Sequence, residues 1–396
     1  MKHLQPEENQ KDATGTVNCK ILSALRRILL GAAVIAAVFS LGWFLTVFLV
    51  GSGFAGAGAG AGNSGAVIMD RYDTYINNSL ADALSDLDGF ARPKKNYWLS
   101  DDTLVAPEPK QNCFGETNDP ATLGWLLEEA AELLGVTNTL FTTDTVIKPG
   151  SVVKYYLDET IFMVTWKQIV DDSVYAISEV KIAHASQFRR FMADGTYGSD
   201  KLYLTTEMAA TVNAVVAASG DFYAFRGQGV IVNNRKVMRA NPYIDVCYVD
   251  ENGDLSFSRF GELKNVDEAQ AYVDANKVRF SIAFGPVLVD NYQKAVPGYY
   301  QLGEPERRYS RAALAQMGER HYLLMTVNYD GCYQVPTIDM LANQMVKFGV
   351  WKAYALDGGQ TATIVVNDEL FNKPDYGAQR KISDIIYFAT AIPENE

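Results

Sequence analysis

The chain is poor in the residues that common metal and nucleophile sites require. Its 396 residues include three His and four Cys, and neither a CxxC pair nor an HExxH motif occurs. A zinc site of ordinary spacing is therefore disfavoured. A GxSxG elbow and a GxxxxGK[ST] loop are also missing, which disfavours hydrolases built on Ser-His or Walker chemistry. We expect no metal and no cofactor.

Positive charge is also scarce. Lys and Arg number 35 against 47 Asp and Glu, which gives a net charge of -12. A nucleic-acid surface needs clustered Lys and Arg, so we expect no nucleic-acid partner. The apolar content is 48%, enough for one large core or two modest ones.

One long apolar run is present, at residues 28–50, and it contains no charged residue. A helix of about 20 apolar residues spans a bilayer, so this run predicts a transmembrane signal anchor. Arg26 and Arg27 precede it, and the next basic residue is Arg71. The positive-inside rule therefore places tail 1–27 in the cytoplasm and the rest outside the cell membrane, single-pass. A cleaved signal peptide is the alternative.

The next segments have little core-forming character. Residues 51–66 are a Gly/Ala linker, in which Gly60–Gly65 fits GxGxxG without the preceding strand that a dinucleotide loop needs. Residues 67–150 predict a juxtamembrane stalk and helical addition, with a helix over 121–134 that begins after Asp119-Pro120.

Residues 151–396 predict one α+β domain with a mixed or antiparallel sheet and few helices. We expect strands at 161–166, 174–182, 322–328 and 354–356, a strand pair within 280–289, hairpins at 229–237, 246–257 and 361–371, and helices at 207–216 and 337–348. Asn233-Asn234 marks the first hairpin turn, and Asn252-Gly253 predicts a type I′ turn in the second.

Three acidic residues share one local pattern. Asp221, Asp330 and Asp357 each follow an apolar run and lie beside glycine. Backbone can approach a ligand closely at such positions, and a carboxylate there can act as a base, an acid or a nucleophile. The alternative is that each Asp only caps a turn. Arg226 and Arg311 lie near these segments and suit phosphate recognition, although a surface ion pair is the simpler interpretation of either.

Five segments then carry a resemblance, in this order: ASGDFYAFR (218–226), FGPVLV (284–289), SRAALA (310–315), DG (330–331) and LDGGQTAT (356–363). Together they resemble the phosphodiester glycosidase family, which includes the uncovering enzyme of mannose-6-phosphate tagging and bacterial relatives associated with exopolysaccharide. The resemblance covers roughly residues 150–392. This chain has Ser219, Gln360 and Ala312 where the family has Asn, Gly and Thr.

The resemblance implies a hydrolase that cleaves the sugar–phosphate bond of a sugar-1-phosphodiester in a glycopolymer or exopolysaccharide of the cell envelope. By position, Asp357 and Asp221 would be catalytic. Residues implied to bind substrate are Arg226, Arg311, Asp330, Ser219, Gly358, Gly359, Gln360 and Thr361.

A second class of function stays open. The substitutions at Ser219 and Gln360 favour a non-catalytic or transferase-type protein that binds a cell-surface glycopolymer, whereas the retained acids and arginines favour an enzyme.

Overall fold

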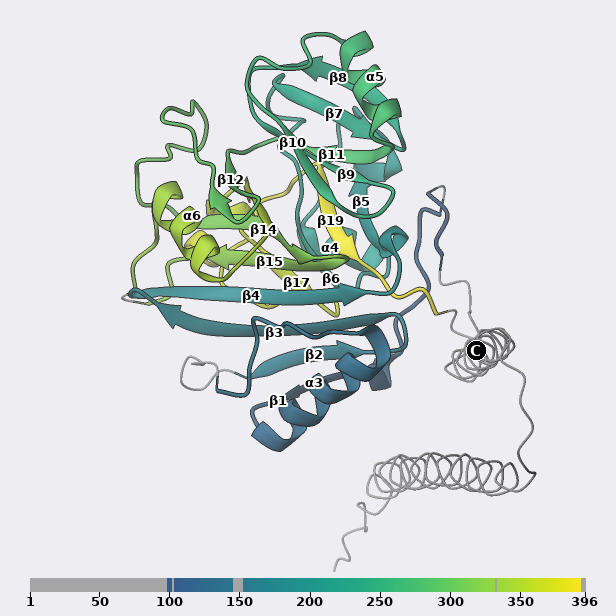
Figure 1. Cartoon of the computed structure of the whole chain (residues 1–396), viewed down its shortest axis with the longest axis vertical. Coiled ribbons are helices and arrows are strands. Elements are labelled where there is room, and N and C mark those ends of the chain that lie inside the picture. Colours follow the sequence, from purple (N-terminus) through teal and green to yellow (C-terminus); the bar gives the residue numbers. More distant parts are fainter. Residues whose placement is uncertain (1–97, 102, 145–151, 332, 393–396) are drawn as a thin grey trace, which may run out of the picture. The chain divides into compact units, whose positions relative to one another are not determined.

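The backbone is built mostly of antiparallel strands, with four helices in the described part of the chain (Figure 1). The computed structural model describes residues 98–101, 103–144, 152–331 and 333–392. These residues belong to one compact unit. The predicted α+β domain, with antiparallel strands and few helices, is confirmed. The predicted membrane segment 28–50 lies outside the described residues, and within them no helix is both long and apolar enough to cross a bilayer.

A nine-stranded sheet forms the largest layer, in the order β1-β2-β3-β4-β15-β14-β16-β12-β13. Its strands are β1 (Phe114–Thr117), β2 (Val153–Leu157), β3 (Ile161–Val170), β4 (Ser173–Ile182), β12 (Val287–Asp290), β13 (Gln293–Lys294), β14 (Arg311–Gly318), β15 (His321–Val327) and β16 (Lys352–Leu356). Part of segment 67–150 belongs to this layer, because β1 pairs with β2.

A five-stranded sheet, in the order β18-β17-β6-β19-β5, packs against the larger one. It contains β5 (Phe188–Met192), β6 (Val216–Ser219), β17 (Ile364–Val366), β18 (Glu369–Leu370) and β19 (Asp384–Phe388). Two smaller sheets hold β7 (Gly229–Asn233) with β8 (Lys236–Asn241), and β10 (Leu255–Ser258) with β9 (Val246–Asp250) and β11 (Val278–Ile282).

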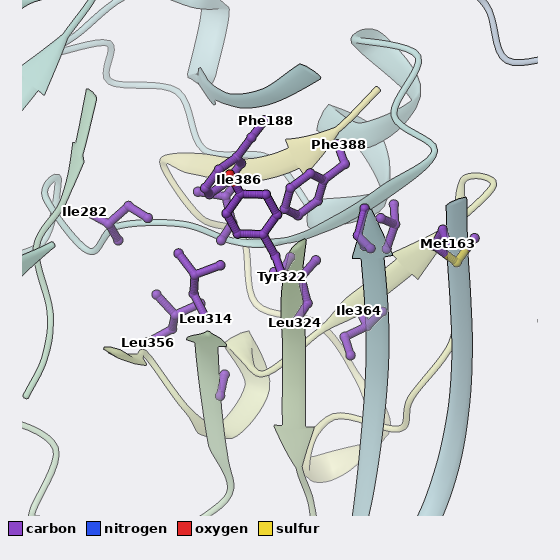
Figure 2. Packing of buried hydrophobic residues seen from close by; sticks show 14 of the residues in the cluster. Met163, Phe188, Ile282, Leu314, Tyr322, Leu324, Leu356, Ile364, Ile386 and Phe388 are labelled. Carbon is purple, nitrogen blue, oxygen red and sulfur yellow. The ribbon is translucent and has the colours of Figure 1, made fainter. Parts of the chain in front are cut away.

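The main core lies between the two larger sheets. Phe188 stacks on Phe388 with ring centroids 4.6 Å apart, and Tyr322 packs against both rings (Figure 2). Side chains alternate along a strand, and β15 therefore sends Tyr322 and Leu324 into this core and Leu323 and Met325 to the opposite face. Each fully buried large apolar side chain stabilises the fold by about 1.5–3 kcal/mol.

Helices cover the outer faces of the sheets. They are α3 (Pro120–Leu134), α4 (Thr205–Thr211), α5 (Val266–Ala275) and α6 (Ile338–Lys347). Helix α3 begins where predicted, because the Asp119 carboxylate accepts hydrogen bonds from the backbone N–H groups of Ala121 and Thr122. Helix α6 begins at the Thr337 cap, as predicted.

Some predicted elements differ from the structure. The helix expected over 207–216 instead spans Thr205–Thr211; Asn213 has a positive φ, which a helix cannot continue through, and Val216 belongs to β6. The prediction that two strands within 280–289 pair with each other is wrong. Strand β11 pairs with β9 in the three-stranded sheet, whereas β12 pairs with β16 in the nine-stranded sheet.

Two of the three predicted hairpins have turns that differ from expectation. The turn of the first is Asn234-Arg235, both with positive φ, one residue beyond the expected Asn-Asn. In the second, only Gly253 has positive φ, and the Asp250 carboxylate accepts from the N–H groups of Asn252 and Asp254. That turn is therefore not type I′. The hairpin around Asn367-Asp368 is confirmed, with positive φ at both residues.

Candidate functional site

Asp357 stands at the end of β16, where the sheet gives way to a tight turn. Its carboxylate accepts a hydrogen bond from the Gly358 N–H at 3.0 Å and forms an ion pair with Arg380 at 2.6 Å. The side chain is 19% exposed, so it lies at the surface end of a buried strand. The acidic residue that ends this apolar run therefore reaches solvent and is paired.

The turn after Asp357 has room only for glycine at its first position. A Cβ on Gly358 would lie 2.1 Å from the backbone oxygen of Ser310 on the neighbouring chain segment. Gly359 has a φ of 65°, which favours glycine, and opens the 3-10 helix η4 (Gly359–Thr361). Thr361 closes the turn by donating from its hydroxyl to the Gly358 carbonyl at 2.7 Å. The predicted set 357–361 thus forms one fixed turn.

Gln360 does not fold back over Asp357. Its side-chain amide donates to the Ala378 carbonyl at 3.2 Å, and the Arg380 N–H donates to the Gln360 carbonyl at 3.3 Å. These two contacts fasten the turn to the segment that carries Arg380. The side chain that replaces the family's glycine is therefore part of the support of the Asp357–Arg380 pair.

Arg226 and Arg380 gather at one aromatic pair. The rings of Phe222 and Phe225 stack with centroids 4.6 Å apart. The guanidinium of Arg380 lies 5.1 Å from the Phe222 centroid, and that of Arg226 lies 5.2 Å from the same ring. Cation–π contacts of this kind hold an arginine in place without using its N–H donors. Two guanidinium groups thus stand beside Asp357.

The electrostatics of Asp357 combine burial with this positive charge. Burial raises the pKa of the Asp357 carboxyl above its ordinary value, while Arg380 and then the turn's hydrogen bonds and Arg226 act in the opposite direction. A carboxylate with a raised pKa is a stronger base than an exposed aspartate. Asp357 is therefore suited to taking a proton from water.

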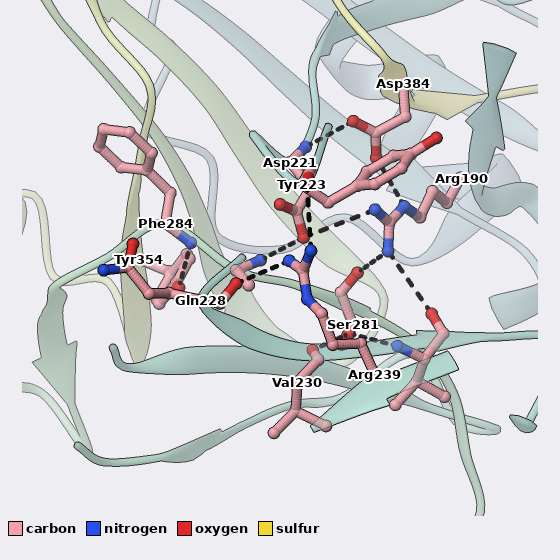
Figure 3. A network of polar contacts seen from close by, with 12 residues as sticks. Arg190, Asp221, Tyr223, Gln228, Val230, Arg239, Ser281, Phe284, Tyr354 and Asp384 are labelled. Carbon is pink, nitrogen blue, oxygen red and sulfur yellow. Dashed lines mark hydrogen bonds and ion pairs between the residues drawn. The ribbon is translucent and has the colours of Figure 1, made fainter. Parts of the chain in front are cut away.

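Asp221, the second predicted catalytic residue, belongs to a different environment (Figure 3). Its side chain is fully buried, and its Oδ2 accepts from the Ala283 N–H at 2.7 Å and lies 3.5 Å from Arg190. Asp384 pairs more closely with Arg190, at 2.6 Å, and accepts from the Asp221 N–H at 2.9 Å. Burial raises the pKa of both carboxyls, and Arg190 opposes that rise.

This buried network supports the segment that carries the aromatic pair. Asp221 directly precedes Phe222 in the chain, and Ala283, which it binds, directly precedes Phe284. The Phe284 N–H donates to the Tyr354 hydroxyl at 2.8 Å, and its ring meets Phe222 edge-on at 6.3 Å. Asp221 is thus placed to position Phe222 and Phe284.

Ser219 lies beneath the same segment at the end of β6. It is buried, and its hydroxyl, like Asp221 Oδ1, has no hydrogen-bond partner among the residues that the structure describes. Unpartnered buried oxygens are rare in folded proteins.

Arg311 lies beside the Asp357 turn, but its guanidinium serves another segment. Its Cα is 3.6 Å from the position of a Cβ on Gly358. The guanidinium donates to the carbonyls of Gly303 at 2.6 Å, Glu304 at 3.0 Å and Arg307 at 2.6 Å. Burial lowers the pKa of Arg311 to about 10. A phosphate could reach this group only by displacing those carbonyls, so its predicted contact with substrate stays a prediction.

Asp330 follows β15 in the loop that starts at Asn328. The Asn328 amide donates to the Gly359 carbonyl at 3.5 Å and its oxygen accepts from the Asn372 amide at 2.7 Å. This loop therefore lies against the Asp357 turn, and Asp330 is two residues further along the chain. Its contact with substrate also stays a prediction.

Sequence reasoning missed Arg380, Arg190 and Asp384. Arg380 stands in a polar segment 23 residues after Asp357 and carries no local pattern of its own. Asp384 does carry a signal, because it is an acidic residue directly before the apolar run 385–388. Within the described ranges, no group of three or more His, Cys, Asp or Glu side chains could hold a metal ion.

One family model matches part of the chain. Residues 212–389 match the model of the family NAGPA, phosphodiester glycosidase, which confirms the resemblance seen in the sequence. The matched segment contains Asp221, Arg226, Arg311, Asp357 and Arg380. No curated protein matches the chain.

Three solved structures are similar in part. A hypothetical protein from Synechocystis is 14% identical with a TM-score of 0.49, over 62% of this chain and 64% of its own. The catalytic domain of zebrafish N-acetylglucosamine-1-phosphodiester alpha-N-acetylglucosaminidase, auto-inhibited by its pro-peptide, is 17% identical with a TM-score of 0.47, over 73% and 99%.

A putative exported protein from Burkholderia pseudomallei is 12% identical with a TM-score of 0.40, over 55% and 74%. Of the Synechocystis protein, the chain covers slightly less than two thirds of the length. All three TM-scores lie below 0.5, so these structures say nothing about activity.

Proposed function

We propose that this chain hydrolyses the bond between a sugar's anomeric carbon and a phosphate oxygen, because residues 212–389 match the phosphodiester glycosidase family model. The observation that carries the proposal is the Asp357–Arg380 pair with Arg226 beside it. A carboxylate that can handle a proton stands next to two cations that can hold a phosphate. These are the groups that cleavage of a glycosyl phosphodiester requires.

Asp357 is proposed to act as the base. Its carboxylate takes a proton from water while the water oxygen forms a bond to the anomeric carbon. The bond from that carbon to the phosphate oxygen breaks, and its electron pair stays on the phosphate. The products are the free sugar and a phosphomonoester. Direct attack by Asp357 on the sugar carbon is the alternative, and it would retain the anomeric configuration.

Arg226 and Arg380 are proposed to hold the phosphate. The transition state places positive charge on the sugar and negative charge on the departing phosphate. Arginine presents paired N–H donors that match phosphate oxygens. The Phe222 ring contacts both guanidinium groups, and cation–π contacts of this kind do not use the N–H donors that would bind a phosphate. Arg380 would exchange part of its pairing with Asp357 for the phosphate.

The setting of the reaction is also part of the proposal. We place the domain outside the cell membrane, anchored by residues 28–50, because that run is apolar and the preceding tail is basic. A membrane-anchored enzyme of this class would act on a glycopolymer or exopolysaccharide of the cell envelope.

The test mixes the full-length chain with a panel of sugar-1-phosphodiesters, nucleotide sugars included, and measures released sugar and phosphomonoester. We expect equal amounts of both products from at least one substrate and a loss of turnover in Asp357→Asn. Transfer of the sugar to an acceptor other than water would give phosphomonoester without free sugar. An Asp357→Asn protein that keeps full activity would remove Asp357 from the mechanism.

A further inference from the structure

Two buried carboxyl groups share one arginine inside the protein (Figure 3). Asp384 Oδ2 lies 2.6 Å from Arg190 Nε, and Asp221 Oδ2 lies 3.5 Å from Arg190 Nη2. All three side chains are at most 1% exposed. If both acids were ionised, one negative charge would have no cation to compensate it, which is strongly unfavourable away from water. The cluster is therefore electrically balanced only when one of the two acids keeps its proton.

The hydrogen bonds indicate which acid is the better place for that proton. Both oxygens of Asp384 accept, Oδ1 from the Asp221 N–H at 2.9 Å and Oδ2 from Arg190 at 2.6 Å. Asp221 Oδ2 accepts from the Ala283 N–H at 2.7 Å, whereas Asp221 Oδ1 is buried and has no hydrogen-bond partner in the part of the chain that the structure describes. Donated hydrogen bonds favour the ionised form of a carboxyl group. They gather at Asp384, and Oδ1 of Asp221 is the oxygen left for a proton.

The other titratable groups around Asp221 do not supply a second partner. Arg239, from β8, acts on Asp221 through its charge. Its guanidinium donates to the carbonyls of Tyr223 at 3.1 Å and Gln228 at 2.7 Å. Burial raises the pKa of Tyr223 to about 12, so this phenol is neutral at ordinary pH. Among the described residues, Arg190 is the one cation within ion-pair distance of Asp221.

The electrostatics agree with this geometry. Burial raises the pKa of the Asp221 carboxyl, Arg190 lowers it, and the negative charge of Asp384 raises it again. Burial also raises the pKa of Asp384, and Arg190 opposes that rise through its charge and its hydrogen bond. Because Arg190 is closer to Asp384 than to Asp221, its charge favours the ionised form of Asp384 more strongly.

We propose that Asp221 is a neutral carboxylic acid in the folded protein and that its proton keeps the Phe222–Phe225 pair in place. Asp221 is then a positioning residue, because Phe222 follows it directly and contacts the guanidinium groups of Arg226 and Arg380. The protonation of Asp221 does not depend on any enzymatic activity. Its effect on catalysis rests on the proposed function.

Ionisation of Asp221 would loosen this segment. The proton would pass to solvent and leave an uncompensated negative charge in the interior. That charge attracts Arg239, whose N–H donors hold the carbonyls of Tyr223 and Gln228. Arg226 lies between those two residues in the chain, so a shift of Arg239 toward Asp221 releases the backbone on both sides of it. The position of Arg226 thereby depends on pH.

The first experiment measures urea unfolding of the full-length chain over a range of pH. Because the folded state has the higher pKa, the unfolded chain releases the proton first as the pH rises. The stabilising effect of the protonated group is complete below the ordinary pKa of aspartate, about 3.9, and is lost as the pH rises through the folded pKa. In this window the unfolding equilibrium constant of the unmodified chain should rise relative to that of Asp221→Asn, by up to about tenfold per pH unit.

Two further variants locate the proton. Asp200→Asn, at an exposed position outside the cluster, should keep the pH dependence of the unmodified chain. Asp384→Asn should be less stable than the unmodified chain throughout, because Arg190 loses its ionised partner. A pH dependence that persists in Asp221→Asn would overturn the proposal. So would an Asp221→Asn protein that does not fold, because the amide is neutral and has nearly the same shape as the acid.

Infrared spectroscopy observes the proton directly. A protonated carboxyl group has a C=O stretching band that a carboxylate lacks. The difference spectrum between the unmodified chain and Asp221→Asn, recorded in heavy water at mildly acidic pH, should contain one such band. The difference spectrum for Asp200→Asn should not contain it. A band that is absent from the unmodified chain, or present at full strength in Asp221→Asn, would contradict the assignment.

The kinetic arm measures kcat/KM against pH with a sugar-1-phosphodiester that the chain hydrolyses. The unmodified chain and Asp200→Asn should lose activity at alkaline pH, and Asp221→Asn should not show that alkaline decline. The same decline in all three proteins would overturn the positioning role of Asp221. A chain that hydrolyses no diester, yet shows the Asp221 band and the pH-dependent unfolding, would keep the protonated Asp221 and reject the hydrolase.

Discussion

Asp221 and Asp357 follow strands of similar length and both lie beside glycine, yet their surroundings are opposite. Asp221 is fully buried beside Arg190 and Asp384, whereas Asp357 stands at a strand end with a half-exposed arginine. The same local pattern in the sequence thus produces one carboxylate that supports the structure and one that can meet a ligand. What separates them is whether another layer covers the strand end.

The largest expected contrast is in catalysis. Asp357→Asn should lower kcat by about 10²–10⁴-fold, the usual contribution of a general base. Asp221→Asn should lower it much less, since its fully buried carboxylate positions Phe222 and Phe284 without touching substrate. Released phosphomonoester measures both. Equal losses in the two variants would end the distinction and make Asp221 a catalytic residue, as the sequence predicts.

For stability we expect the opposite order: a change in the buried Arg190 network should matter more than a change at Asp357. Asp384→Ala removes the closest partner of buried Arg190 and the acceptor of the Asp221 N–H, so it should destabilise the fold by about 3–5 kcal/mol. Asp357→Ala should cost at most about 1 kcal/mol, because its partner Arg380 is 42% exposed. The urea unfolding midpoints of the two variants measure this difference in stability. A stable Asp384→Ala protein would show that Arg190 finds other acceptors.

The tightness of the Asp357 turn can be tested at Gly358. In Gly358→Ala the new methyl group meets the Ser310 backbone oxygen, so the variant should lose about 1–3 kcal/mol of stability and part of its activity. Gly124→Ala is the control, because Gly124 lies in α3 with open space around it. It should be neutral or stabilising by up to about 1 kcal/mol.

The smallest expected effect is a shift in pH dependence. If catalysis needs ionised Asp357, the acid limb of kcat/KM lies above the ordinary pKa of aspartate, because burial raises the pKa of Asp357. Arg380 lowers that pKa, so Arg380→Gln should move the acid limb to higher pH. Arg235→Gln, at a surface position that pairs with Asp101 and Glu251, should leave it unchanged. A limb that moves to lower pH in Arg380→Gln would mean that Asp357 is not the titrating group.

The local parts of the candidate site could be predicted from sequence. The turn 357–361 and the caps of α3 and α6 follow from glycine, Asp119 and Thr337, whose effects act over a few residues. The pairing of Asp357 with Arg380 and of Arg190 with Asp384 could not be predicted, because the two members of each pair are 23 and 194 residues apart in the chain.

The sequence by itself determined the mainly antiparallel fold, the resemblance of one segment to a family model, and the positions of Asp221 and Asp357 after apolar strands, since alternation and turn residues act locally. Only the tertiary structure decided that Asp221 is enclosed, that Arg311 binds a loop, and that Arg380 stands beside Asp357. Those outcomes depend on which strand ends are covered when the sheets pack. Burial and charge pairing arise between segments far apart in the chain, and no short stretch of sequence contains them.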